Sequence, residues 1–285
     1  MNRDRFRFFQ CSHLETDLLI GIPPDQFRSG MDQCALREIR RVRSIIETYA
    51  GSHPQFLTSL EPLPVPEKVT SEVRKIGAAS VPEKGAASVP EKGAASVPEK
   101  GAASVPEKVA PGVREQGIPG EIGTMLRCGA DSGTGPMSAV AGLVAEKVGN
   151  RLVGDYRLSE LVVENGGDLF MVNNRDATTV IQAGDSPFSG KLALNIPAGS
   201  WGICTSSGTL GHSFSFGKAD AVTVVAGSAP LADAWATSLA NRVQSPADIE
   251  IVMALVEKIP EIWGCVAVVG DRVGIRGKFE LKPLS

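Results

Sequence analysis

The 285-residue sequence is poor in histidine and in aromatic residues, and it carries little excess charge. Its three histidines, His13, His53 and His212, are too few and too scattered to form a histidine-rich metal site. The formal net charge is −3, whereas nucleic-acid binding usually needs a concentrated basic surface. We therefore expect no nucleic-acid partner, and we interpret the basic stretch at 37–43 as a solvated helix face.

Paired cysteines and long apolar runs are also missing. The five cysteines form no C-x-x-C pair, which argues against a zinc site or a disulfide framework and favours a reduced, cytoplasmic setting. No stretch approaches the ~20 apolar residues of a membrane span, and no apolar run of signal length follows the basic start. The sequence predicts a soluble, cytoplasmic protein with no membrane partner and no secretory signal.

Three familiar catalytic or nucleotide-binding motifs are absent as well. There is no G-x-G-x-x-G after a strand and no Walker A lysine, so these two kinds of nucleotide binding are not supported. Residues 204–208 read Cys-Thr-Ser-Ser-Gly rather than the G-x-S-x-G of a serine nucleophile. His212 follows Ser207 by five residues, so two interpretations stay open: a catalytic serine–histidine pair, or a structural hydrogen bond.

What the sequence does contain is a tandem repeat. GAASVPEK occurs four times over residues 77–108. A proline every eight residues forbids a continuous helix, and one valine per octad cannot build a core. We expect residues 62–118 to be a flexible, low-complexity insertion, with a partner-binding role as the alternative. It would divide one domain into an N-terminal strand and helix part, 1–61, and a main part with the ligand pocket, 119–285.

The rest of the chain mixes strand and helix patterns without strict alternation. Strands are expected at 15–22 and in short runs from 161 to 227, and a hairpin is expected around Gly270-Asp271. Helices are expected at 35–51, 136–150, 231–243 and 247–259. This mixture favours an α+β fold over a doubly wound parallel sheet.

Two glycine-rich clusters are candidates for ligand binding. In residues 129–142, Gly133 and Gly135 precede an expected helix start, where backbone N–H groups could bind an anion; the alternative is a flexible loop. In 162–170, the turn Asn165-Gly166-Gly167 lies between Glu164 and Asp168. It predicts a hairpin, which could also place the two carboxylates at one end of a sheet.

A third cluster joins the turn at 204–217 to a helix that follows it. Thr205, Ser206 and Gly208 form the turn, and its backbone N–H groups are candidate anion donors. On the helix, Asp233 and Thr237 are four residues apart and share a face. A carboxylate and a hydroxyl in this arrangement suit Mg²⁺, although Asp233 is equally explained as an acid favoured by the helix dipole.

Together these stretches resemble a family. The order ETDLLI, GPMSAVAG, ENGGDLF, CTSSGTLGHSFSFGKADAV and LADAWAT is similar to an uncharacterised branch of the ApbE-like superfamily. ApbE proteins are FAD- and Mg²⁺-dependent FMN transferases that attach flavin phosphate to a protein threonine. The resemblance implies an ApbE-like fold of mixed sheets with packed helices, and it implies that Asp233 and Thr237 help to hold the metal.

The sequence also departs from the transferases. They carry a histidine, an aspartate-proline and a threonine-glycine segment between the TSG-like turn and the VTV strand, whereas this interval is GHSFSFGKADA, with His212 as the counterpart and no proline. The loop that holds the flavin in the transferases therefore has no counterpart in this sequence, which argues against FAD binding and FMN transfer. The branch resembled here is also linked to sulfide incorporation during homocysteine formation, which implies a role in sulfur metabolism.

Our leading hypothesis is an enzyme or enzyme component, such as a divergent transferase, that binds a small anionic ligand with Mg²⁺. The ligand would be phosphate-bearing or flavin-like (FAD or FMN), with His212 as acid or base. The alternative is a non-catalytic accessory protein of sulfur assimilation that acts through a protein partner. The oligomeric state is left open, with a homo-oligomer among the alternatives.

Overall fold

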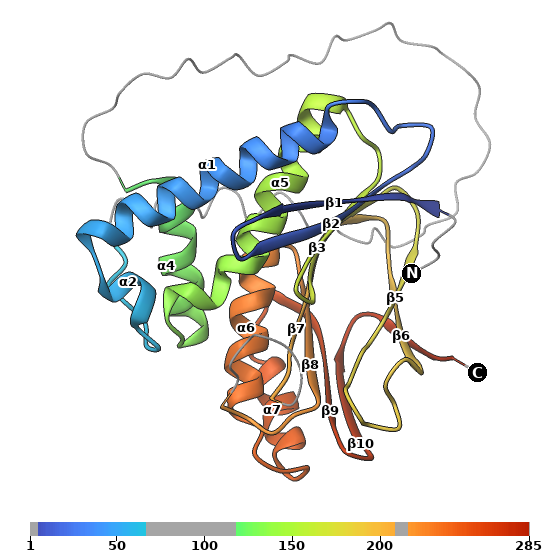
Figure 1. Cartoon of the computed structure of the whole chain (residues 1–285). Helices are drawn as coiled ribbons and strands as arrows, with labels where there is room; N and C mark the ends of the chain where they lie inside the picture. The colour runs from blue at the N-terminus through green and yellow to red at the C-terminus, as the bar shows by residue number, and fades with distance from the viewer. Residues whose placement is uncertain (1–4, 67–117, 209–215, 285) are drawn as a thin grey trace, which may run out of the picture.

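An antiparallel sheet of eight strands separates a layer of helices from a smaller, three-stranded sheet (Figure 1). This is the arrangement in the computed structural model of the chain, which describes residues 5–66, 118–208 and 216–284. It confirms the α+β fold expected from the mixture of strand and helix patterns. The octapeptide repeat and His212 lie outside the described residues.

The strands form two sheets in which every neighbouring pair is antiparallel. The large sheet has the order β1 (Arg7–His13), β2 (Thr16–Ile22), β3 (Leu161–Asn165), β4 (Asp168–Asn173), β7 (Gly199–Ser206), β8 (Ala221–Ala226), β9 (Ile262–Val269) and β10 (Arg272–Gly277). The small sheet has the order β11 (Glu280–Pro283), β6 (Leu192–Ile196) and β5 (Ala177–Val180). The hairpin expected at Gly270-Asp271 is confirmed as the turn between β9 and β10.

The helices cover the other face of the large sheet (Figure 1). They are α1 (Met31–Ser52), α2 (Gln55–Thr58), α4 (Gly120–Ser132), the 3₁₀ turn η2 (Pro136–Ala139), α5 (Val140–Tyr156), α6 (Ala229–Asn241) and α7 (Asp248–Val256). Helices α5 and α6 lie against the middle of the sheet, where α5 contacts β3 and β4 and α6 contacts β7 and β8.

Several boundaries differ from those that the sequence predicted. Helix α1 begins four residues earlier and continues through Gly51, which was expected to stop it. The helix expected from Pro136 is divided into η2 and α5. Part of the expected loop at 129–142 belongs to α4, which the sequence did not reveal. Strands β1 and β11 were also not predicted.

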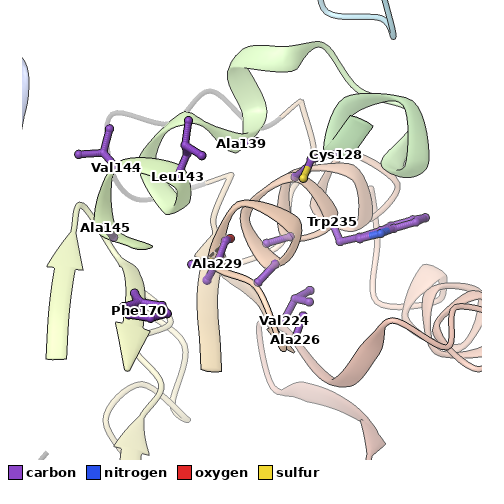
Figure 2. Packing of buried hydrophobic residues seen from close by; sticks show 14 of the residues in the cluster. Cys128, Ala139, Leu143, Val144, Ala145, Phe170, Val224, Ala226, Ala229 and Trp235 are labelled. Atoms are coloured by element: carbon purple, nitrogen blue, oxygen red, sulfur yellow. Dashed lines mark hydrogen bonds between the residues drawn. The ribbon is translucent and has the colours of Figure 1, made fainter. Parts of the chain in front are cut away.

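Two hydrophobic cores follow from these layers. The larger one lies between the large sheet and the helices, and the smaller one lies between the two sheets. Figure 2 shows part of the larger core, with Phe170 of β4 below α5 and Val224 of β8 near α6. Alternation along the strands explains the division, because Phe170 faces the helices while its neighbour Met171 faces the small sheet.

Helices α5 and α6 approach each other closely at their N-terminal ends. A Cβ atom on Gly142 would overlap the carbonyl of Ala229, and one on Gly202 of β7 would overlap the backbone of the same residue. Glycine is therefore required at both positions for close approach. The glycine at position 142 thus lets the starts of α5 and α6 lie close together above the sheet.

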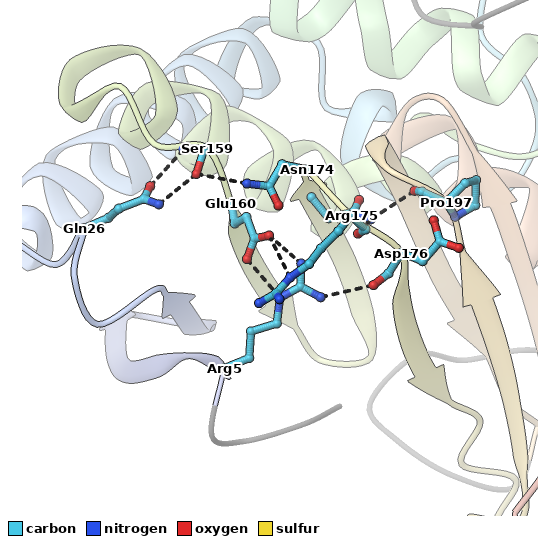
Figure 3. A network of polar contacts seen from close by, with 9 residues as sticks. Arg5, Gln26, Ser159, Glu160, Asn174, Arg175, Asp176 and Pro197 are labelled. Atoms are coloured by element: carbon cyan, nitrogen blue, oxygen red, sulfur yellow. Dashed lines mark hydrogen bonds and ion pairs between the residues drawn. The ribbon is translucent and has the colours of Figure 1, made fainter.

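A polar network joins Arg5, just before β1, to Glu160, just before β3 (Figure 3). Arg5 binds Glu160 through two hydrogen bonds, from Nε at 2.9 Å and from Nη2 at 2.6 Å. Arg175 lies 3.6 Å from the same carboxylate. Because Arg5 and Arg175 both pair with the carboxylate of Glu160, we assign this network a structural role.

Candidate functional site

The candidate site is a cavity of about 240 Å³ beside the N-terminal ends of α5 and α6. It is formed by five separate parts of the chain: the end of α2, the connection from α4 into the start of α5, the first residue of β4, Phe216, and one face of α6. Its lining residues are Leu57, Ser59, Leu60, Thr134, Gly135, Met137, Ser138, Val140, Ala141, Asp168, Phe216, Asp233, Thr237 and Asn241.

Four of the residues proposed from the sequence line this cavity. They are Gly135, Asp168, Asp233 and Thr237, so the structure brings together one member from each of the glycine-rich clusters and both members of the helical pair. Outside the lining lie the other described candidates: Gly133, Glu164, Asn165, Gly166, Gly167, Thr205, Ser206, Ser207 and Gly208. The Ser207–His212 pair is not described, because His212 lies outside the described residues.

Two buried carboxyl groups line the cavity and influence each other electrostatically. Asp168 opens β4, and Asp233 lies one turn into α6. Burial raises the pKa of Asp168, while hydrogen bonds from the Cys204 thiol and the Thr205 backbone N–H oppose the rise. Burial also raises the pKa of Asp233 well above its usual range, and the nearby charge of Asp168 raises it further. The site therefore holds a pair of acids that resist carrying two negative charges together.

Asp233 also has a structural partner. Its Oδ2 accepts a hydrogen bond of 2.9 Å from the backbone N–H of Gly142 in the first turn of α5. In the reverse direction, Glu146 of α5 accepts a 2.7 Å hydrogen bond from the backbone N–H of Ala229, the first residue of α6. Each helix thus supplies a carboxylate that satisfies an N–H group left open at the start of the other. This reciprocal capping fixes Asp233 in the cavity.

The Asn165-Gly166-Gly167 segment forms the hairpin turn that its sequence predicted. Both glycines have positive φ, 64° and 106°, which a two-residue hairpin turn of this kind requires. Glu164 accepts a 2.7 Å hydrogen bond from the Gly167 N–H, and the Asn165 side chain donates to the carbonyl of Ala141 at 3.0 Å. These contacts join the turn to the start of α5 and place Asp168 at the cavity.

At the end of β7, the hydroxyl group of Ser206 differs from that of its neighbour Thr205. Thr205 pairs across the sheet with Thr223, with 2.9 Å between their hydroxyl oxygens. Ser206 shares the helix-facing side of β7 with Cys204, because residues two apart in a strand share a face. The Ser206 hydroxyl is buried and has no hydrogen-bond partner among the residues that the structure describes. Buried polar groups are normally satisfied, so this oxygen is a candidate for a bound group.

Several of the backbone donors considered for anion binding already have acceptors. The N–H groups of Gly133 and Thr134 both donate to the carbonyl of Gly129 and close the C-terminal end of α4. The Gly208 N–H donates to the carbonyl of Ala219 at 2.9 Å. The side chains of the cavity, rather than these three N–H groups, are therefore the groups available to a ligand.

Sequence reasoning missed the apolar rim of the cavity. Leu57, Leu60 and Phe216 line it and remain 49%, 69% and 64% exposed, respectively. Exposed apolar side chains beside a cavity with a few polar groups are typical of ligand-binding sites. No local pattern marks these residues, because the two leucines lie more than 150 positions away from Phe216 in the chain.

The donor set at the cavity suits a hard cation better than a transition metal. Among the described residues, no group of three or more His, Cys, Asp or Glu side chains is placed to hold a metal ion. Mg²⁺, however, is commonly held by one or two carboxylates and completes its coordination with waters or phosphate oxygens. Asp168, Asp233 and the hydroxyl of Thr237, which all line the cavity, fit that requirement.

The cysteines give no sign of reactive thiols. All five are free and buried, and burial raises the pKa of Cys204 well above its ordinary value, with Asp168 and Asp233 adding to the rise. A protonated, enclosed thiol is a poor nucleophile. In the part of the chain that the structure describes, no helix is long and apolar enough to cross a membrane.

Comparisons with known proteins point to one family. A family model described as AbpE bacteria matches residues 107–260. A UPF0280 protein of Methanothermobacter thermautotrophicus is 41% identical over 160 residues, which are 54% of this chain and 62% of that protein. A UPF0280 protein of Methanococcus aeolicus is 37% identical over 276 residues, which are 95% of this chain and 90% of that protein. The match thus spans less than two thirds of the first relative but most of the second.

The same fold occurs in a solved structure. The crystal structure of the ApbE protein of Thermotoga maritima aligns with a TM-score of 0.52, covering 96% of this chain and 97% of that one. Only 11% of the aligned residues are identical, so this likeness shows the fold alone. The fold that the sequence resemblance implied is thereby confirmed.

Proposed function

Because this chain belongs to the UPF0280 family and matches the family model described as AbpE bacteria, we propose that its cavity binds a small phosphate-bearing or flavin-like anion together with Mg²⁺. The observation that carries the proposal is the buried pair of carboxyl groups, Asp168 and Asp233, that line the cavity. Two such groups are costly to bury as anions. A divalent cation held by these two groups would offset their negative charge and would attract an anionic ligand.

Each residue of the candidate site has a defined role in this proposal. Asp168, Asp233 and Thr237 would hold the ion. When bound, Mg²⁺ supplies Lewis-acid polarisation of a phosphoryl oxygen. The reciprocal capping by Glu146 keeps α6, and therefore Asp233, in place. His212 remains our candidate acid or base, and Ser207 our candidate nucleophile.

The size of the cavity limits what it can enclose. Its volume of about 240 Å³ lies below the roughly 300–1,000 Å³ of sites that bury drug-sized ligands. The cavity therefore suits the phosphate-bearing end of a flavin or a similar molecule. The exposed rim formed by Leu57, Leu60 and Phe216 would contact the apolar remainder. FMN transfer to a protein threonine would be a further step, and we do not propose it, because the flavin-clasping segment of the transferases is unmatched in this sequence.

The accessory role in sulfur metabolism is the weaker proposal. A protein that acts only through a partner would not need a buried pair of acids beside a cavity. The comparisons point to the ApbE-like family and do not favour the alternative.

Calorimetry on the full chain tests the proposal. FMN should bind in the presence of Mg²⁺ and should be released by EDTA. Asp233→Ala should weaken Mg²⁺-dependent binding at least tenfold, because it removes one of two carboxylates from the ion. Asp185→Asn changes an exposed acid on the connection between β5 and β6 and should leave the affinity unchanged. Equal FMN affinity in Asp233→Ala, or in EDTA, would overturn the role of the ion.

A further inference from the structure

An exposed aromatic side chain lies at the cavity on a backbone that is held in place. Phe216 lines the cavity and is 64% exposed. Its backbone N–H donates to Oδ1 of Asn241 at 2.8 Å, and its carbonyl accepts a hydrogen bond from Nε2 of Gln244 at 3.0 Å. Asn241 is the last residue of α6, and Gln244 follows three residues later. Both hydrogen-bonding groups of the Phe216 backbone are therefore held by the end of this helix.

The residues after Phe216 pack against the same helix end. A Cβ atom on Gly217 would overlap the carbonyl of Ala240, and the N–H of Lys218 donates to the carbonyl of Val243 at 2.7 Å. This part of the backbone therefore has little freedom to carry the phenyl ring away from the cavity. An exposed aromatic ring on a fixed backbone offers a flat apolar face to a ligand at a low cost in conformational entropy.

The polar residues that α6 contributes to the cavity lie in one row. Asp233, Thr237 and Asn241 follow one another at intervals of four residues and all line the cavity, so they share one face of the helix. At a rise of about 1.5 Å per residue, the first and the last are about 12 Å apart along the helix axis. An acid proposed to hold the cation thus lies at one end of the row, and the residue that holds Phe216 lies at the other.

We propose that Phe216 makes this cavity select phosphate esters that carry a planar aromatic ring, and that this ring stacks on the exposed face of the phenyl group. The inference rests on the proposed function and narrows its ligand from small anions in general to the flavin-like class. The phosphate lies with the cation at Asp233, and the ring lies at Phe216. Because the two ends of the row are separated, the ligand needs a spacer between phosphate and ring, and the ribityl chain of FMN is such a spacer.

Two phosphate esters that differ in the ring provide the probes. Ribitol 5-phosphate has the phosphate and the spacer of FMN but lacks the ring. With Mg²⁺ and the full chain, calorimetry should show FMN binding about tenfold more tightly, the effect of one ring stacked on an aromatic side chain. Phe216→Ala should bring the two affinities within about twofold of each other, because the stacking face is removed. Phe216→Trp should keep the preference, whereas Phe216→Leu, which is apolar but not planar, should lose most of it.

An exposed apolar residue elsewhere provides the matched control. Ile251 on α7 is 68% exposed and does not line the cavity, so Ile251→Ala should keep the tenfold preference. Should Phe216→Ala fail to fold, Phe216→Leu makes the same comparison. Equal binding of the two probes to the wild type, or a preference that survives in the folded Phe216 variants without an aromatic ring, would overturn the inference. Binding of ribitol 5-phosphate with Mg²⁺ would then leave the proposed function standing. If neither probe binds with Mg²⁺, both proposals fail.

Discussion

Burial alone does not decide in which direction the pKa of an acid shifts in this protein. Glu160 and Asp233 are both buried, yet their pKa values move in opposite directions. Hydrogen bonds from Arg5 lower the pKa of Glu160. Asp233 has only backbone N–H groups and another acid nearby, and its pKa is raised. The direction of the pKa shift depends on the partner, and an acid without a cationic partner is the better candidate for ligand binding.

The first prediction concerns Glu160. Because its folded-state pKa is lowered below the ordinary value of 4.5, it adds stability that is fully present above pH 4.5 and is lost as the pH falls through the folded-state value. Glu160→Gln should reduce the free energy of unfolding by about 2 kcal/mol at pH 7, because Arg5 keeps its charge and loses its partner.

Urea denaturation at pH 7 and at pH 3 measures this effect. The difference between Glu160→Gln and wild type should be smaller at pH 3, where the wild-type carboxylate gains protons. Glu250→Gln, an exposed acid on α7, should change little at either pH. An equal loss at both pH values would mean that packing, rather than charge, explains the role of Glu160.

At the scale of elements, the crossing of α5 and α6 organises the site. Gly142 lets the two helix starts approach, and the capping contacts of Asp233 and Glu146 then hold them together. Thr134 and Ser138, which precede α5, line the same cavity as Asp233 on α6. A change at the crossing should therefore alter stability and site geometry together.

The second prediction compares two glycines of the same helix. Gly142→Ala should cost about 1–3 kcal/mol, because its Cβ would overlap the carbonyl of Ala229. Gly154→Ala has open space around it and should stabilise α5 by up to about 1 kcal/mol, because alanine is the better helix former. Thermal denaturation of both variants decides the matter, and a stabilised Gly142→Ala would show that the helices can separate at no cost.

Local pattern predicted most of these elements, but not the contacts between them. The apolar runs at 161–165 and 201–206 became central strands, and Asn165-Gly166-Gly167 became a hairpin, because period and turn chemistry are local properties. Gly51 was expected to end α1, yet the helix continues through it; a glycine weakens a helix by only about 1 kcal/mol, which packing of its apolar face can offset. Strand β1 was missed because it follows a charged start and is half exposed.

At the scale of the whole molecule, the site depends on topology that one sequence does not reveal. Asp168 and Asp233 were each identified, but their pairing arises because β4 lies beside β7 and α6 packs above both. The leucines of the rim reach the cavity because α1 and α2 bring the N-terminal part of the chain to η2. Composition and spacing can identify such residues as candidates. Their proximity depends on the order of the strands, which composition and spacing do not predict.

The last prediction concerns the repeat, which connects the described parts of the chain. Deleting residues 77–108 shortens the 51-residue connection from 67 to 117 to 19 residues. For a flexible connection, closing the shorter loop costs about 0.9 kcal/mol less entropy, so the deletion should raise the melting temperature by about 2–3 °C and leave FMN affinity unchanged. Calorimetry measures both quantities. A lower melting temperature would mean that the repeat packs against the rest of the protein, and unchanged stability with impaired function would identify the repeat as a docking segment for a partner.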